Sequence, residues 1–381
     1  MPSSAAPGRA ANDVGSLRST IETADTVVRQ SIDILDGLST VTIEDRPELD
    51  VVALARDSAA LVRAHTTKIS LLVINEPFTP SAISKVLREL IGGPVPSLVS
   101  AAQLCVPSRY TGPFRDILVA ACRSALHALR DLVQIIPTNG KALSDGLENG
   151  TNSKSHSLQV TGIVWNRCDE VKRLADKGIA GCLVEKVERY RDELKDVMEE
   201  LKEWGEETGE SDEDDDASDF DGPENKLTAA QDMLDDIMNS HSTIPADDPD
   251  KIRERLESCL RRLRLMTLLY QAINKRRLKT LPKLPTSTPC ADLDRVGDTF
   301  RILGGMIDGL CDVADAFYGL DKERIDLEMK EKFGEASKVA ELLRKPWGEA
   351  ETDEFTEWAK KVSGANNQVM RNIMPDLHSR L

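Results

Sequence analysis

The chain contains few of the features that mark membrane proteins and enzymes. Only 4% of its 381 residues are aromatic, and its longest strongly apolar run covers Ile69–Ile74, which is far shorter than a membrane-spanning helix. It has no glycine-rich phosphate loop and neither an H-E-x-x-H nor a G-x-S-x-G motif. We therefore expect no membrane segment, no enzymatic activity, no cofactor and no small-molecule substrate.

The seven cysteines and five histidines are scattered along the sequence. No C-x-x-C pair occurs, and no histidine stands at metal-ligand spacing from a cysteine, which argues against a metal site. An odd cysteine count and an N-terminal segment without an apolar core predict reduced thiols in the cytoplasm or nucleus. His127 falls in an apolar helical pattern and is expected to be a core or boundary residue. Four cysteines in similar patterns are expected to be small core residues, namely Cys122, Cys168, Cys259 and Cys311.

The negative charge of the chain is concentrated in one segment. The formal net charge is −16, and twelve acidic residues but no lysine or arginine lie between Glu203 and Glu224. Such a run cannot bury enough apolar surface to offset the entropy of ordering it, so we expect a disordered, solvated linker. It is interpreted either as a partner-binding or regulatory tract or as a simple spacer. The acidic balance argues against nucleic acid as the main partner, because phosphate binding needs a basic face.

Apolar residues recur at intervals of three and four positions, and no strand-like alternation of comparable length is present. This period places the apolar residues on one face of an α-helix, and helices with such faces pack side by side in bundles. The clearest segments are 17–38, 114–135, 180–204, 252–273 and 293–317. The fold class is therefore predicted to be all-α, with two antiparallel helical-bundle domains joined by the acidic linker.

The predicted domain ranges follow from the position of the linker. They are a disordered N-terminus at 1–11, a first bundle at 12–202, the acidic linker at 203–226 and a second bundle at 227–381.

Local signals mark several helix boundaries. Thr79-Pro80 predicts a helix start, with a capping hydroxyl followed by a proline whose missing N–H has no cost there. The stretch 138–157 is rich in glycine, asparagine and serine and predicts a loop. The last helix is expected near 352–374.

The apolar seam from Ala180 to Trp204 has two interpretations. It could pair with a helix of another protein in the manner of a zipper. Packing within this chain is favoured, because the neighbouring predicted helices carry matching seams.

The stretch Thr161–Trp204 resembles the cyclin-D-interacting protein family, also called cyclin-D-binding-protein-like. That family has a helix with a "VW…C" pattern, a short basic linker, and a long helix that leads into an acidic tract. The matching residues here are Val164, Trp165, Cys168, Lys172–Lys177 and Glu199–Asp216. Weaker matches occur at 67–90, 256–279 and 291–318, so the resemblance touches most of the chain.

The resemblance implies an all-helical protein of the nucleus and cytoplasm, with two domains likened to vinculin-type bundles. It implies a non-enzymatic adaptor that binds D-type cyclins or helix-loop-helix proteins and so restrains cell-cycle progression or modulates transcription. The alternative is a structural role, in which a vinculin-like bundle binds cytoskeletal or adhesion partners.

The segment Lys251–Lys283 is strongly basic, with eleven lysines and arginines against Glu254 and Glu257. A solvated helix face is the favoured interpretation. The alternatives are a nuclear import signal at 275–279, or an R-x-L docking motif that fits a cyclin groove. A further hypothesis has the acidic tract fold over this helix. The partner-binding candidates are Lys275, Arg276, Arg277, Leu278, Lys279 and Leu281.

Two serines in the acidic tract are candidate phosphorylation sites. Ser211 and Ser218 each have carboxylates one and three residues downstream, the pattern that acidophilic kinases recognise. Each phosphate adds about −1.5 to −2 charges, which predicts tighter association with the basic segment or with a basic partner.

Overall fold

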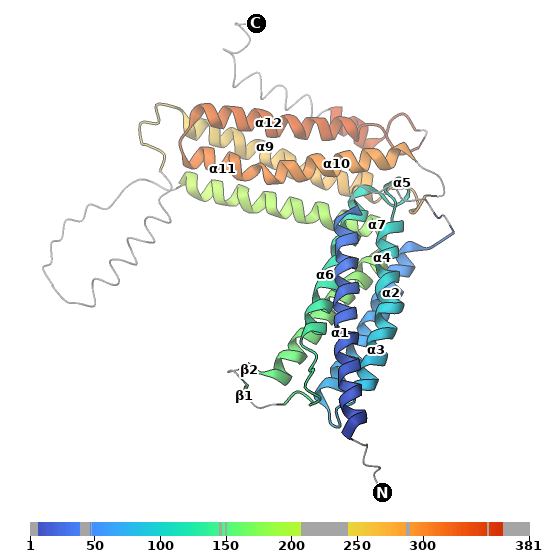
Figure 1. Cartoon of the computed structure of the whole chain (residues 1–381). Coiled ribbons are helices and arrows are strands. Elements are labelled where there is room, and N and C mark those ends of the chain that lie inside the picture. Colours follow the sequence, from blue (N-terminus) through green and yellow to red (C-terminus); the bar gives the residue numbers. More distant parts are fainter. Residues whose placement is uncertain are drawn as a thin grey trace, which may run out of the picture. The chain divides into compact units, whose positions relative to one another are not determined.

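The computed structural model describes eight stretches of the chain, and the regular structure in them is almost entirely helical (Figure 1). The prediction of an all-α fold is confirmed. The chain divides into two compact units, which are described separately: unit 1 is Met1–Leu183 with Pro282–Gly297, and unit 2 is Val184–Leu281 with Asp298–Leu381. The described residues are 7–38, 46, 48–144, 147–148, 151–206, 243–286, 290–348 and 350–360.

Unit 1 is a bundle whose helices bury the apolar stripes seen in the sequence. Those that lie wholly in this unit are α1 (Pro7–Asp36), α2 (Val51–Ile74), α3 (Pro80–Gly92), α4 (Pro94–Leu104), α5 (Pro107–Tyr110) and α6 (Gly112–Gln134). α1 packs against α3 and α6, and α2 packs against α3 and α4. Along α1, Leu17, Ala24 and Val28 are fully buried, as helical periodicity requires.

Two helix starts in unit 1 differ in detail from the prediction. α1 begins at Pro7, so 7–11 are helical and not part of a disordered N-terminus. Proline suits this place because the first N–H of a helix has no partner within it. α3 begins at Pro80 as predicted, but the Thr79 hydroxyl donates to the Pro77 carbonyl oxygen at 3.0 Å and does not cap the helix.

The predicted polar loop at 138–157 contains a very small β-ribbon. β1 (Leu147–Glu148) and β2 (Thr151–Asn152) pair in antiparallel fashion, with Leu147 opposite Asn152. With two residues in each strand, the ribbon leaves the fold class unchanged. It directly precedes the long helix α7 (Ser153–Glu206), whose start therefore falls inside the range predicted as loop.

Helix α7 is broken at a glycine. Gly178 has φ 74° and ψ 166°, a conformation that glycine adopts easily because it has no Cβ. The break directly follows Lys172–Lys177, the basic linker that the sequence places between two helices. α7 then continues to Glu206, so the first residues of the predicted acidic linker are helical. From 207 to 242 the chain lies outside the described residues.

The division between the units falls after Leu183. The sequence-based range 12–202 assigns the second half of α7 to the first domain, whereas the structure groups that half with unit 2. Aromatic packing gives the physical reason. The ring of Trp204 lies 6.2 Å from that of Phe317 and 5.5 Å from that of Tyr318, in edge-on geometry.

Unit 2 is a second bundle built on the later part of α7. Its other elements are α9 (Ile252–Ile273), the π-helix η2 (Asn274–Leu278), most of α10 (Ala291–Asp308), α11 (Leu310–Tyr318), α12 (Lys322–Leu342) and a helical segment at 354–360. α12 packs against α9 and α11. The α7 residues Val187, Leu194 and Leu201 are fully buried. The seam is therefore used for packing within the chain, as predicted.

Two residues expected in or near the core are exposed instead. Cys122, Cys168 and Cys259 are buried as predicted, but Cys311 is exposed, and so is His127. Successive residues of a helix are turned by about 100°, so the neighbour of a core residue can face solvent. At both places the apolar pattern predicted burial for a residue that lies next to the buried face of its helix.

Candidate functional site

The six predicted partner-binding residues lie in η2 and the segment that follows it, and they are divided between surface and core. Those that are exposed or half-buried are Lys275, Arg276, Lys279 and Leu281. Arg277 and Leu278 are only 1% and 3% exposed. The π-helix contributes to this division, because the N–H of Lys279 donates to the Asn274 carbonyl at 3.1 Å and the wider turn shifts the residues that face inward.

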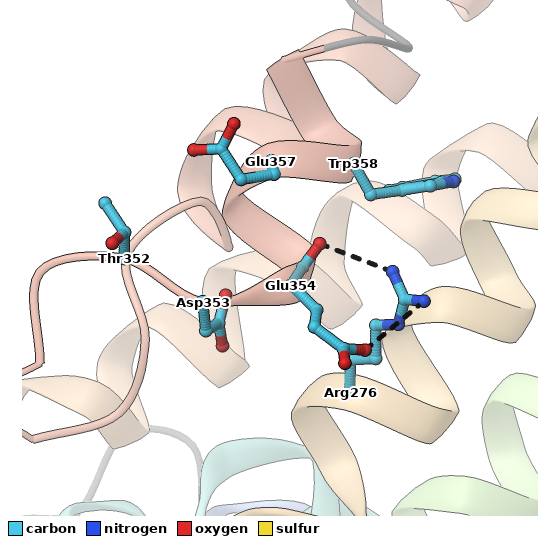
Figure 2. Close-up of a pocket in the computed structure, with 6 residues that line it drawn as sticks. All are labelled: Arg276, Thr352, Asp353, Glu354, Glu357 and Trp358. Atoms are coloured by element: carbon cyan, nitrogen blue, oxygen red, sulfur yellow. Dashed lines mark hydrogen bonds and ion pairs between the residues drawn. The ribbon is translucent and has the colours of Figure 1, made fainter.

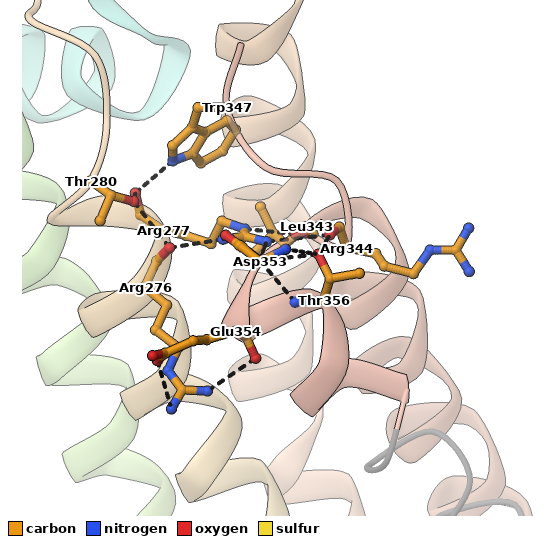
Figure 3. Close-up of polar contacts among 9 residues, drawn as sticks. All are labelled: Arg276, Arg277, Thr280, Leu343, Arg344, Trp347, Asp353, Glu354 and Thr356. Atoms are coloured by element: carbon orange, nitrogen blue, oxygen red, sulfur yellow. Dashed lines mark hydrogen bonds and ion pairs between the residues drawn. The ribbon is translucent and has the colours of Figure 1, made fainter. Parts of the chain in front are cut away.

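All five N–H groups of the buried Arg277 guanidinium have acceptors (Figure 3). Two bind the Asp353 carboxylate, at 2.6 and 3.0 Å. The other three donate to backbone carbonyl oxygens, those of Leu343 at 2.7 Å, Arg276 at 2.9 Å and Arg344 at 3.3 Å. A buried charge is tolerated only when it is paired and hydrogen-bonded, and this arginine meets both conditions.

Asp353 is fixed from both sides. Besides Arg277, it accepts the N–H of Thr356 at 2.9 Å, which caps the helical segment at 354–360. The hydrogen bond from Arg277, followed by those from Thr356, lowers the pKa of Asp353 to about 2, because these donors favour the charged carboxylate. The Trp347 indole N–H donates to the Arg277 carbonyl oxygen at 2.7 Å. We call Arg277, Trp347, Asp353 and Thr356 the Arg277 clasp.

An open pocket lies beside the clasp (Figure 2). It has a volume of about 610 Å³ and is lined by Arg276, Thr352, Asp353, Glu354, Glu357 and Trp358. The Arg276 guanidinium lies 3.3 Å from the Glu354 carbonyl oxygen and 3.5 Å from its carboxylate. Trp358 also packs against Phe355, with ring centroids 5.5 Å apart. The pocket thus joins an indole ring, a guanidinium and three carboxylates.

Most of the other basic side chains of Lys251–Lys283 face solvent, and some of them are paired, but Arg262 is only 3% exposed. Arg255 makes a bidentate pair with Asp326, with both distances 2.9 Å. Arg264, Lys275 and Lys279 are exposed and form no ion pair within the described part of the chain. The favoured interpretation of a solvated helix face therefore fits the exposed side chains but not Arg262 or Arg277, which are buried.

The predicted core cysteines other than Cys311 are buried, and burial changes their chemistry. Burial raises the pKa of Cys122, Cys168 and Cys259 to about 12, so their reactive thiolates do not form near neutral pH. Within the described ranges, no group of three histidine, cysteine or acidic side chains is placed to hold a metal ion. No helix in those ranges has both the length and the apolar character needed to cross a membrane.

Sequence reasoning found Arg276 and Arg277 but missed the residues that surround them. Asp353 has a local signal, since an aspartate three residues before Thr356 at a predicted helix start is typical of an N-cap. Trp347 has no such signal, because its hydrogen bond to Arg277 joins residues 70 positions apart. Trp358 is identified only by the pocket that it lines. Ser211 and Ser218, the predicted phosphorylation sites, lie outside the described residues.

The family model that matches this chain covers residues that precede the pocket residues in sequence. Residues 55–207 match a family model described as "Grap2 and cyclin-D-interacting, N-terminal", which confirms the predicted resemblance. An uncharacterized protein of Schizosaccharomyces pombe is 22% identical over 329 residues, covering 86% of this chain and 87% of the relative. No solved structure matches the chain. The family match runs from α2 to the end of α7 and does not include the pocket.

Proposed function

Because residues 55–207 match the model of the Grap2 and cyclin-D-interacting family, we propose that this chain is a non-enzymatic adaptor. It binds cyclin-type or helix-loop-helix regulators and thereby modulates cell-cycle progression or transcription. The family match carries the proposal. The helical scaffold supports it, since amphipathic helices and the grooves between them are common docking surfaces for protein partners.

Exposed apolar side chains within the matched range support a protein partner. Leu61 and Leu71 on α2 are 51% and 53% exposed, and Leu158 and Ile163 on α7 are 47% and 44% exposed. These helices are neighbours, because the Thr161 hydroxyl lies 3.1 Å from that of Ser70 and Arg63 pairs with Asp169 at 3.3 Å. Exposed apolar side chains on these neighbouring helices are therefore candidates for contact with a protein partner.

Docking through the R-x-L pattern is less well supported. Leu278 is 3% exposed, so its insertion into a cyclin groove requires that it first leave the core of unit 2. We therefore place the contact with the regulator on the exposed residues of α2 and α7.

The test is affinity capture from proliferating cells with quantitative mass spectrometry. We expect the intact chain to enrich cyclins or helix-loop-helix factors, and a Leu71→Glu/Leu158→Glu variant to lose them. The matched control is Ile34→Glu on α1, where Ile34 is 45% exposed and lies outside the matched range. A deletion of 203–224 shows whether the acidic tract contributes.

The result needs a direct counterpart with purified proteins. A cyclin or helix-loop-helix factor that is enriched should bind the purified chain in calorimetry, and the control variant should bind equally well. Enrichment of actin-linked proteins in place of both regulator classes contradicts the proposal and supports the alternative of a structural, vinculin-like bundle.

We further propose that the chain is present in both the cytoplasm and the nucleus and that Ser211 and Ser218 are phosphorylated. For import, the exposed Lys275 and Lys279 are available to a receptor, whereas Arg277 is not. Loss of nuclear signal in a Lys275→Gln/Lys279→Gln variant supports the import role. Mass spectrometry that finds both serines unmodified in proliferating cells contradicts the phosphorylation proposal.

A further inference from the structure

The pocket beside the Arg277 clasp already holds a guanidinium. Arg276 reaches from η2 to Glu354, and Figure 2 shows its guanidinium on the same side of the helical segment as the Trp358 ring. Its two contacts are long, at 3.3 and 3.5 Å, and its side chain is 31% exposed. The position beside Glu354 therefore accepts a guanidinium, and the present contacts of Arg276 there are weak.

Hydrogen bonds hold Asp353, one of the residues that line the pocket, in a fixed position. Asp353 is fixed by the buried Arg277 and by the Thr356 N–H, at distances of 2.6 to 3.0 Å. Those bonds set the start of the helical segment that carries Glu354 and Trp358. A site whose residues are ordered before binding loses less entropy when its ligand arrives.

The rim carries negative charge that a ligand can reach. The Glu354 and Glu357 side chains are 85% and 60% exposed. Their present pairs, with Arg276 and Lys360, are of the surface type and contribute little stability, so exchange for another cation costs little. The Asp353 charge is already neutralised by Arg277.

We propose that this pocket binds an arginine side chain from a basic peptide segment of a partner, which replaces Arg276 at Glu354 and stacks on Trp358. Arginine fits better than lysine, because its planar guanidinium stacks on indole and pairs with carboxylates through two parallel hydrogen bonds. An acidic ligand is disfavoured by the exposed carboxylates of Glu354 and Glu357. The inference does not depend on which regulator the family match implies.

The test follows the Trp358 indole N–H in a proton–nitrogen correlation spectrum of the full chain, assigned through a Trp358→Phe variant. The probe is the tripeptide acetyl-Ala-Arg-Ala-amide, and the control is the same peptide with neutral citrulline. We expect a saturable shift of the Trp358 signal with the arginine peptide only. The Trp347 signal, whose N–H is bonded to Arg277, reports whether the clasp stays intact.

Two variants with opposite expected effects make the test sharp. Glu354→Gln should weaken binding about 2- to 5-fold, as expected for one exposed ion pair. Arg276→Gln should strengthen binding by a similar factor, because it removes the internal competitor. Glu351→Gln, exposed and outside the lining, should change nothing. The proposal is overturned if the citrulline peptide gives the same shift, if no shift occurs, or if Arg276→Gln weakens binding.

Discussion

Arg277 is the residue whose role changes most between sequence and structure. In the sequence it stands in a run of cations that resembles an exposed import signal. In the structure its side chain is 1% exposed, every N–H has an acceptor, and the ring of Phe355 lies 4.3 Å from the guanidinium carbon. A buried pair of this kind holds the helical segment at 354–360 in one place. Its net contribution to stability is small, because the cost of desolvating the two charges offsets their attraction.

Removing the partner of this buried cation should be costly. We expect Asp353→Asn to lower the free energy of unfolding by about 2–3 kcal/mol at neutral pH, between the values typical of exposed and buried pairs. The pKa of Asp353 is lowered to about 2 from 3.8, so its contribution is present above the ordinary value and is lost as pH falls toward the folded value. The gap between wild type and variant should therefore close between about pH 5 and pH 2.

Urea unfolding followed by circular dichroism at a series of pH values measures this gap. Glu351→Gln is the control, because Glu351 is exposed and its replacement should leave the stability unchanged at every pH. A gap for Asp353→Asn that is as wide at the acid end as at neutral pH contradicts the assignment of the Arg277–Asp353 pair.

Single residues also show which features the sequence predicts and which it does not. Periodicity identified Leu194 and Leu201 as core residues, because burial of apolar side chains is a local consequence of helical pattern. It could not identify the pairing of Arg277 with Asp353, which lies 76 residues away. It also placed Cys311 in the core, since a pattern alone does not fix the angle at which a helix meets its neighbours.

At the scale of elements, Gly178 gives α7 its break. Its φ of 74° lies where residues with a Cβ are strained, so Gly178→Ala should destabilise the chain by about 1–3 kcal/mol. Gly162 lies in the same helix, without a positive φ and with open space where a Cβ would be. Gly162→Ala should instead stabilise by about 0.5–1 kcal/mol, because alanine is the better helix former.

Thermal and urea unfolding of the two variants test this contrast directly. Each serves as the control for the other, since both add one methyl group to α7. Shifts of the same sign would mean that the conformation at Gly178 is not the cause of the break.

The elements themselves were largely predictable, and the exceptions have a common cause. The apolar period marked α1, α6, α9 and the long α7, and proline marked the start of α3. The π-helix η2 was not predicted, because its wider turn becomes favourable only when Arg277 can be buried against the segment that follows α12. Contacts between distant segments are not encoded in any local pattern.

At the scale of the whole molecule, the domain boundary predicted from the acidic linker differs from the division between the two compact units. A change in composition shows where the chain is most polar, but side-chain packing determines which helices belong to the same compact unit. The second half of α7 belongs to unit 2 because Trp204 and its neighbours on the seam find their partners there. A long helix can therefore pass from one compact unit to the next without any signal in composition.

The distribution of charge leads to the last prediction. Twelve of the sixteen excess negative charges lie between Glu203 and Glu224, whereas Arg264, Lys275 and Lys279 are exposed on unit 2 without ion pairs among the described residues. Opposite charges at a surface attract weakly, and salt screens them beyond about 10 Å at 0.1 M. We therefore expect limited proteolysis near Asp214 to be slower at low salt than at high salt.

The same experiment separates charge attraction from a direct effect of salt on the protease. Cleavage of a short acidic peptide measured at both salt concentrations supplies the correction. A variant with Arg264→Gln, Lys275→Gln and Lys279→Gln should lose most of the salt dependence, because each exposed contact contributes about 0–1 kcal/mol and only their sum protects the tract. Equal corrected rates at low and high salt in the wild type rule out an acidic tract that covers this basic face.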